Sequence, residues 1–158
     1  MLEVLFVCSG NICRSPTAEG VFGALLDEHG LTRDIGVDSA GLGAWHVGEA
    51  PDRRAQAAAR QRGIELGGQR ARQARAEDFR RFDYVIAMDE SNRDGLARLC
   101  PAGAEGRIHL FLDFAPGSGR REVPDPYYGA GDGFDTVLDL IEAASRGLLA
   151  HIRAHDLS

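Results

Sequence analysis

Short runs of strand-forming residues alternate with helix-forming segments along the whole chain. The predicted strands cover residues 2–7, 35–39, 82–88 and 108–111, and the helix-forming segments cover residues 16–30, 51–62, 89–99 and 134–155. The third run, FDYVIAM, has almost no polar alternation, which is typical of a parallel strand that is covered on both faces. Strands that alternate with helices pair in parallel through right-handed crossovers. The pattern therefore predicts an α/β fold, a three-layer sandwich with a small parallel sheet of about four strands.

The length and the composition agree with one domain. A chain of 158 residues is close to the usual size of a domain, so we expect residues 1–158 to form a single one. Hydrophobic residues make up 44% and charged residues 27%, an ordinary balance for a globular protein that folds without a disulfide or a structural metal. We expect the sheet to have a flavodoxin-like winding.

The charged residues exclude several classes of function. The 18 basic residues against 24 acidic ones give a net charge of −6, which argues against a nucleic-acid partner and against an anionic membrane surface. All the basic residues are arginine, and the absence of lysine excludes a Walker phosphate-binding loop and Schiff-base catalysis. Any anion site must therefore be local and built on arginine, which binds oxyanions in a fork.

The N-terminal segment and the cysteines indicate the compartment. The start of the chain has no basic region and carries Glu3 within its apolar stretch, so no signal peptide is readable, and no apolar run reaches the ~18 residues of a membrane span. We expect a cytoplasmic protein, with secretion by a route without a signal peptide left open. Cys8, Cys13 and Cys100 are then free thiols. No second Cys or His pair at ligand spacing accompanies Cys8 and Cys13, so we expect neither a metal nor a cofactor.

The segment CSGNICRS, residues 8–15, joins the first predicted strand to the first predicted helix. Anions bind where the carboxyl edge of a parallel sheet meets a helix N-terminus. If the loop curls, the backbone N–H groups of residues 9–14 can point at the oxygens of a dianion, and Arg14 can clamp it with two hydrogen bonds. A thiol in such a positive field ionises readily, so Cys8 is predicted to be a nucleophile that needs no general base.

A phosphate ester of a phenol also needs a proton for its leaving oxygen. The loop amides and Arg14 can stabilise the charge on the equatorial oxygens, but the proton must come from an acid elsewhere in the chain. Residues 116–133 form an unusually long predicted loop, and such loops are often functional. This loop contains Asp125 in the segment VPDPYYG, which makes Asp125 the candidate general acid.

These residues resemble the low-molecular-weight protein tyrosine phosphatase family. The resembling segments, spread over most of the chain, are CSGNICRSPTAEG, DSAG, WHVG, RARQ, FDYVIAMDESN and DPYYG. A lone Cys-x5-Arg would be a weak signal, but the Asp-Pro-aromatic-aromatic sequence downstream makes it specific. The resemblance implies hydrolysis of phosphotyrosine in protein substrates through a phosphocysteine intermediate, with phosphate or another oxyanion in the loop. We expect a monomer.

The resemblance also implies roles for individual residues. Cys8 is the nucleophile, Arg14 binds the phosphoryl group, Ser15 hydrogen-bonds the thiolate, and Asp125 acts first as the acid and then as the base that activates water. Asn11 maintains the loop shape with help from Ser39, and Cys13 can form a reversible disulfide with Cys8 under oxidation. The expected substrate-binding residues are Ser9, Gly10, Asn11, Ile12 and Cys13 in the loop, and Trp45, Tyr127 and Tyr128 as aromatic walls.

Two positions modify what the resemblance implies. Gln69 stands where animal relatives carry histidine, which puts a hydrogen-bond network through that position in doubt. Ile12 replaces the threonine that is typical of relatives acting on phosphoarginine, and so favours a phenol ester.

Several alternatives remain open from the sequence. The same loop and three cysteines would serve a thiol-dependent arsenate reductase, and the same nest of amides could belong to a non-catalytic phosphotyrosine-binding module. Trp45 could be an ordinary core residue, and His46 is expected to be structural or solvent-facing. Asp89 and Asn92 are expected to cap the third helix. The arginine-rich residues 70–81 are expected to form a solvated face.

Overall fold

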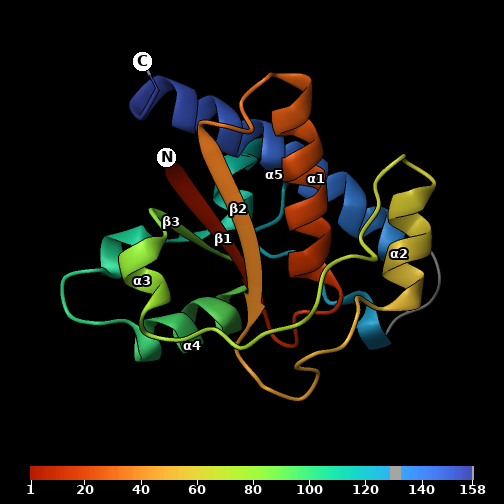
Figure 1. The fold of residues 1–158 in the computed structure, drawn as a ribbon, viewed down its shortest axis with the longest axis horizontal. Helices are drawn as coiled ribbons and strands as arrows, with labels where there is room; N and C mark the ends of the chain where they lie inside the picture. The colour runs from red at the N-terminus through yellow and green to blue at the C-terminus, as the bar shows by residue number, and fades with distance from the viewer. Residues whose placement is uncertain (129–132, 158) are drawn as a thin grey trace.

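A computed structural model describes residues 1–128 and 133–157, and of Tyr128 only the backbone. Its centre is a sheet of four parallel strands in the order β2-β1-β3-β4 (Figure 1). The strands are β1 (Leu2–Cys8), β2 (Ile35–Gly41), β3 (Tyr84–Ala87) and β4 (Ile108–Leu110). The predicted α/β class with a small parallel sheet is confirmed.

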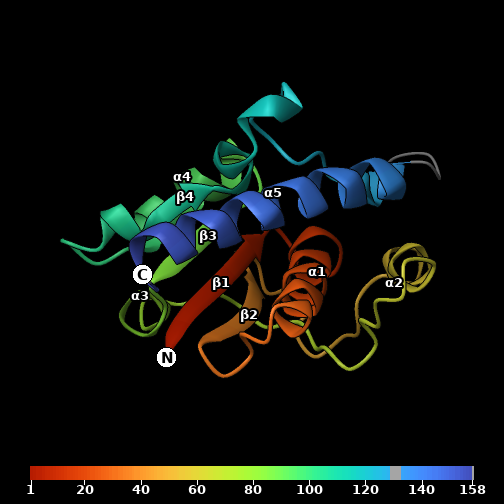
Figure 2. The same ribbon diagram turned by 90° about the horizontal axis from the view of Figure 1, so that it is seen from above.

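Helices cover both faces of this sheet. On one face α1 (Arg14–Glu28) packs against the long C-terminal helix α5 (Gly133–His155), as Figure 2 shows. The other face is covered by α3 (Asp78–Arg81) and α4 (Glu90–Leu99). Helix α2 (Arg53–Arg60) lies beside α1 and α5, at the periphery of the molecule (Figure 1).

The central strand β1 is buried on both faces. Val4, Phe6 and Cys8 face the apolar layer formed with α1 and α5. Leu5 and Val7 face the opposite layer, formed with α3 and α4. This two-sided burial is the reason why the β1 and β3 sequences lack polar alternation.

Three local features differ from the sequence prediction. Helix α1 begins at Arg14 and not at Pro16, which lies in the first turn, where its missing N–H has no cost. Helix α3 falls within residues 70–81, which were predicted to be a solvated face, and it buries Asp78 and Phe79. The predicted loop 116–133 contains two short 3-10 helices, Pro116–Ser118 and Pro126–Tyr128.

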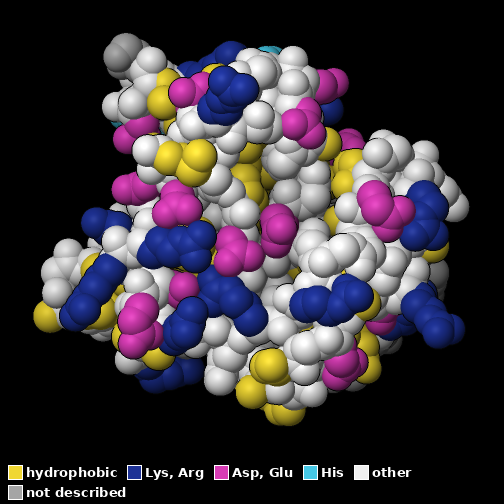
Figure 3. All heavy atoms as spheres, viewed as in Figure 1, with side chains coloured by type: hydrophobic (Ala, Val, Ile, Leu, Met, Phe, Trp, Pro, Cys, Tyr) yellow, Lys and Arg dark blue, Asp and Glu magenta, His cyan; other side chains and the backbone are white. Residues whose placement is uncertain are grey.

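Arg72 explains why the solvated-face prediction was wrong for part of this run. Its guanidinium donates to Asp38 Oδ2 at 3.1 Å and to both carboxylate oxygens of Asp78, each at 3.1 Å. The arginine therefore connects the middle of β2 to α3. Figure 3 shows the arginine side chains of this face interspersed with carboxylates. No helix within residues 1–128 and 133–157 combines the length and the apolar character needed to cross a membrane.

Candidate active site

The loop between β1 and α1 lies where the chain leaves the carboxyl end of the central strand. Because β2 and β3 flank β1 on opposite sides, this is the switch point at which α/β sheets bind ligands. Asn11 has a φ of 59°, and among the described residues it alone combines positive φ with a side chain. The end of β2 approaches the loop so closely that a Cβ on Gly41 would lie 2.9 Å from the Gly10 carbonyl carbon. Glycine is required there.

Cys8 ends β1 with its side chain inside the curl of this loop. Its Sγ lies 3.0 Å from Ser15 Oγ and accepts the Asn11 backbone N–H at 3.3 Å. Ser15 Oγ already accepts from Asn11 Nδ2 at 2.9 Å, so its own proton is available to the sulfur. The other acceptor near that proton, the Ala40 carbonyl, is farther away at 3.4 Å. Cys8 Sγ therefore accepts a hydrogen bond from the Ser15 hydroxyl and another from the Asn11 backbone N–H.

Asn11 connects the loop to its surroundings through its side-chain amide. Nδ2 also donates to Ser39 Oγ at 3.0 Å, and Oδ1 accepts the Arg72 backbone N–H at 3.0 Å. Ser39 Oγ in turn donates to Glu19 Oε1 at 2.8 Å. Burial raises the pKa of Glu19, and this hydrogen bond opposes the rise. The amide is thus held from the first turn of α1, from β2 and from the segment after α2.

Gln69 lies at the edge of this network. Its Oε1 is 3.5 Å from Ser39 Oγ, and its Nε2 donates to the Pro16 carbonyl at 2.9 Å. Gln69 therefore contacts both Ser39 and the first turn of α1. From the sequence, a hydrogen-bond network through this position was in doubt.

Arg14, the first residue of α1, is almost completely buried, with 2% of its surface exposed. Its Nη1 donates to Asp89 Oδ2 at 2.6 Å and to the Val123 carbonyl at 2.9 Å. Its Nη2 lies 3.6 Å from Asp125 Oδ2. Burial lowers the pKa of Arg14, but the sulfur of Cys8 and the Asp89 carboxylate outweigh this effect and raise the pKa. The guanidinium stays charged and is held in one orientation.

Asp89 has a role that the sequence did not reveal. As predicted, it caps α4, because its Oδ1 accepts the Asn92 backbone N–H at 2.7 Å. Its second oxygen accepts from Arg14. The available signal was its position directly after β3, since the carboxyl ends of neighbouring parallel strands lie together.

Cys13, the second cysteine of the loop, is in a different environment from Cys8. Burial, together with the nearby charges of Asp52 and Cys8, raises the pKa of the Cys13 thiol well above its ordinary value. Cys13 therefore stays protonated at neutral pH.

Cys8, Cys13 and Arg14 line a pocket of about 90 Å³. Asp125, which is 37% exposed, stands at its mouth with Oδ1 accepting the Tyr127 backbone N–H at 3.1 Å. Trp45 and Tyr127 line the entrance, and Trp45 is 73% exposed, so it is not a core residue. The predicted wall position of the Tyr128 ring lies outside what the structure describes. The full lining is Cys8, Ser9, Gly10, Ile12, Cys13, Arg14, Trp45, His46, Asp125 and Tyr127.

His46 belongs to this lining, although no role in the site was assigned to it from the sequence. Its ring centroid lies 6.3 Å from that of Tyr127, and its Nδ1 is 3.2 Å from Glu49 Oε2. A Cβ on Gly10 would meet the imidazole at 3.0 Å, so the ring packs directly against the loop backbone. The histidine therefore lines the pocket together with Trp45 and Asp125.

Comparisons with known proteins identify the family of this chain. The family model for low molecular weight phosphotyrosine protein phosphatases matches residues 3–157. A low molecular weight protein-tyrosine-phosphatase from Streptomyces coelicolor is 46% identical over 96% of this chain and 93% of its own. The crystal structure of a protein tyrosine phosphatase from Entamoeba histolytica has a TM-score of 0.94 at 38% identity, covering 98% of each chain. That of a Drosophila arginine phosphatase has a TM-score of 0.91 at 34% identity, covering 98% of this chain and all of its own. The chain therefore belongs to the low molecular weight phosphotyrosine protein phosphatase family.

Proposed function

We propose that this chain hydrolyses phosphotyrosine in proteins through a phosphocysteine intermediate on Cys8. The observation that carries the proposal is the meeting, in one pocket, of a buried cysteine and a fixed guanidinium from one loop with a carboxyl group from a distant part of the chain. A thiolate, an oxyanion clamp and a proton donor are the groups that transfer of a phosphoryl group from a phenol requires.

In the first step the Cys8 thiolate attacks phosphorus, and an S–P bond forms as the P–O bond to the phenol breaks. The protonated carboxyl group of Asp125 gives its proton to the departing phenol oxygen. The loop amides and Arg14 bind the equatorial oxygens, whose charge they stabilise without reorganisation because Asp89 and the Val123 carbonyl already fix the guanidinium.

In the second step Asp125, now a carboxylate, takes a proton from water. The resulting hydroxide equivalent attacks phosphorus, the S–P bond breaks, and phosphate and the Cys8 thiolate are released. Ser15 Oγ and the Asn11 backbone N–H stabilise the sulfur as a leaving group, because both contact it in this structure. Asp125 is accessible enough to do both tasks, since it is 37% exposed.

The walls of the pocket support an aryl phosphate over a phosphoguanidine. Trp45, Tyr127 and the aliphatic side chain of Ile12 surround the entrance, and flat apolar walls suit a phenol ring. Because one similar structure is that of an arginine phosphatase, phosphoarginine is the comparison substrate for this assignment.

The test of the nucleophile is turnover of phenyl phosphate and of a phosphotyrosine peptide in EDTA. We expect Cys8→Ser to abolish turnover and Cys100→Ser, a half-exposed cysteine whose Sγ donates to the Pro101 carbonyl, to retain it. Wild-type turnover by Cys8→Ser would refute the mechanism. Thiol-dependent arsenate turnover that requires Cys100 would favour the reductase, and tight phosphopeptide binding without phosphate release would favour a binding module.

The test of the acid compares leaving groups. Asp125→Asn should slow phenyl phosphate hydrolysis by roughly 10²–10⁴-fold, the usual contribution of a general acid. It should slow 2,4-dinitrophenyl phosphate much less, because that phenolate leaves without a proton. Asp94→Asn, on the exposed face of α4, is the matched control. Equal losses on the two substrates would contradict the role of Asp125.

We propose that the enzyme is a cytoplasmic monomer that acts on proteins. We also propose that it binds neither nucleic acid nor membrane. The net charge of −6 supports the absence of polyanionic partners. The three cysteines are all free, as is usual in a reducing compartment. Size-exclusion chromatography with light scattering tests the monomer, and a dimer at micromolar concentration would overturn that part.

A further inference from the structure

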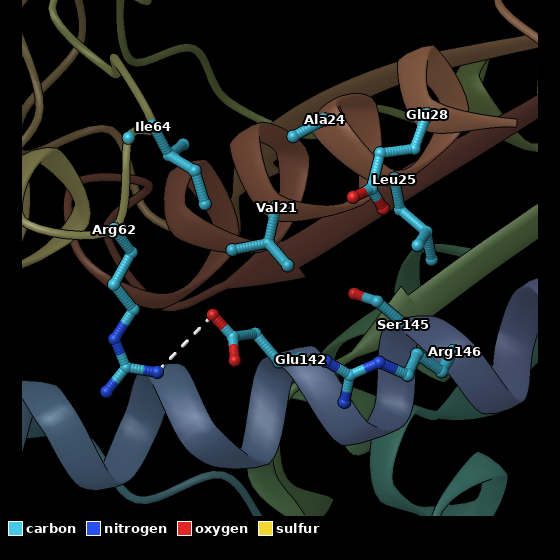
Figure 4. Close-up of a pocket in the computed structure, with 10 residues that line it drawn as sticks. Val21, Ala24, Leu25, Glu28, Arg62, Ile64, Glu142, Ser145 and Arg146 are labelled. Atoms are coloured by element: carbon cyan, nitrogen blue, oxygen red, sulfur yellow. Dashed lines mark ion pairs between the residues drawn. The ribbon is translucent and has the colours of Figure 1, made fainter. Parts of the chain in front are cut away.

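A second pocket, of about 260 Å³, lies between α1 and α5. It shares no lining residue with the candidate active site. Figure 4 shows Val21, Ala24 and Leu25 of α1 on one side, Glu142, Ser145 and Arg146 of α5 on the other, and Arg62 and Ile64 at one end. The catalytic mechanism uses none of these residues.

Ser145 supplies a polar group that lacks a partner in the folded chain. The residue is 1% exposed, and within the described parts of the chain its Oγ has no hydrogen-bond partner. In Figure 4 this oxygen points from α5 into the pocket. An unpaired buried hydroxyl is unfavourable, so a ligand that hydrogen-bonds to it gains affinity.

The wall opposite Ser145 is apolar. Val21 and Leu25 project from α1, and Ile64 closes the end of the pocket beside them. These side chains provide a surface for an apolar group of modest size, because the volume of about 260 Å³ is slightly below that of a typical drug-binding pocket.

The charges around the pocket favour a cation. Arg62 is already engaged with Glu142, Asp135 and Asp139, at 3.3, 3.4 and 3.0 Å respectively. Glu28 has no ion pair within the described residues, and its carboxylate turns back from α1 toward the pocket in Figure 4. Arg146 is then the remaining cation of the lining. The lining itself holds two carboxylates, Glu28 and Glu142, against two guanidiniums, but Asp135 and Asp139 beside Arg62 add two further negative charges around the pocket, and this balance attracts positive charge.

We infer that this pocket binds a small organic cation with an apolar body, such as a primary arylalkyl ammonium. The ammonium group donates to Ser145 Oγ and pairs with the Glu28 carboxylate. The apolar body packs against Val21, Leu25 and Ile64.

The test is calorimetric titration of the full chain with 2-phenylethylamine, 2-phenylethanol and phenylacetate, which differ mainly in the charge of the head group. Saturating inorganic phosphate is present throughout to occupy the candidate active site. We expect the amine to bind at least about tenfold more tightly than the alcohol or the acid. In a methyl-detected NMR titration, the amine should shift the signals of Val21, Leu25 and Ile64.

Two variants test whether Ser145 and Glu28 are the polar partners of the ammonium group. Ser145→Ala should weaken amine binding by at least about fivefold, because a hydrogen bond to a charged group is lost. Its melting temperature should not fall, since Oγ has no partner to lose. Ser118→Ala, which removes a serine hydroxyl bonded within its own turn, should bind like wild type.

Glu28→Gln is the second variant. Because Glu28 is exposed, this variant should fold even if Ser145→Ala does not. It should also weaken the amine at least about threefold, whereas Glu77→Gln, an exposed glutamate at the N-cap of α3, should not. Absence of amine binding at millimolar concentration, tighter binding of phenylacetate, or unchanged affinity in both pocket variants would overturn the inference.

Discussion

Replacing Asn11 by alanine tests whether the shape of the phosphate-binding loop depends on a single side chain. The Asn11 amide is 3% exposed and makes three hydrogen bonds, to Ser15 Oγ, to Ser39 Oγ and from the Arg72 backbone N–H. Asn11→Ala removes all three, and Asn11→Gly removes the same three while tolerating the positive φ of 59°.

The expected losses follow from these contacts. The loss of three hydrogen bonds at about 1 kcal/mol each lowers the free energy of unfolding by about 3 kcal/mol in both variants. Alanine also adopts the left-handed conformation at a cost of roughly 1–2 kcal/mol, whereas glycine loses about 0.5–1 kcal/mol of extra chain entropy on folding. Asn11→Ala should therefore be less stable than Asn11→Gly by about 0.5–1 kcal/mol.

Urea unfolding followed by circular dichroism measures the stability of each variant relative to wild type and the difference between the two variants. The kcat/KM for phenyl phosphate reports the shape of the loop. We expect both variants to lose activity, because Ser15 is no longer held beside Cys8 by the amide. The reasoning is refuted if either variant loses less than about 1 kcal/mol, or if Asn11→Gly is the less stable of the two.

Three further predictions concern charge and protonation. Asp89→Asn should lower kcat/KM for phenyl phosphate about tenfold or more, because the 2.6 Å bond to Arg14 is to a charged group; unchanged kinetics would contradict this. Iodoacetate at pH 7 should label Cys8 before Cys13, since burial raises the pKa of Cys13, and peptide mapping by mass spectrometry checks the order. Burial lowers the pKa of His109 below its ordinary 6.5, so the unfolded chain binds more protons and stability should fall as pH drops below about 6.5. His109→Gln should flatten the dependence of the melting temperature on pH between about 7 and 5.5, and an unchanged slope would exclude this histidine as its source.

The two central strands, β1 and β3, were predictable because each is an apolar run bounded by a turn or by a helix start. β3 illustrates this, since FDYVIAM contains one acidic residue before a stretch that is buried on both faces. The start of α1 was less predictable. Pro16 is accepted anywhere in the first turn, so composition alone did not show that Arg14 and Ser15 are already helical. That shift matters because the helix sets the directions of both side chains.

The partners of the site arginines could not be predicted from local patterns. Asp89 was identified as a helix cap, which it is, but a carboxylate has two oxygens and the cap uses only one. Arg72 lies in a run whose composition is typical of a solvated surface, yet it pairs with Asp38 and Asp78. The contacts of Arg14 with Asp89 and of Arg72 with Asp38 depend on how the strands are arranged, and the order β2-β1-β3-β4 is not contained in any short segment.

The same strand order explains why the CSGNICRS segment alone is insufficient to make the site. Support for this segment comes from both neighbours of β1: Ser39 on β2 holds Asn11, and Asp89 after β3 holds Arg14. The Val123 carbonyl, in the segment that leads to Asp125, is a third source of support, because it accepts a hydrogen bond from Arg14. A Cys-x5-Arg segment placed in another sheet would lack these partners, and a buried guanidinium without them would be strongly destabilising. The specificity of the sequence signal therefore comes from the distant segments, because they are the parts that make the loop stable in its phosphate-binding shape.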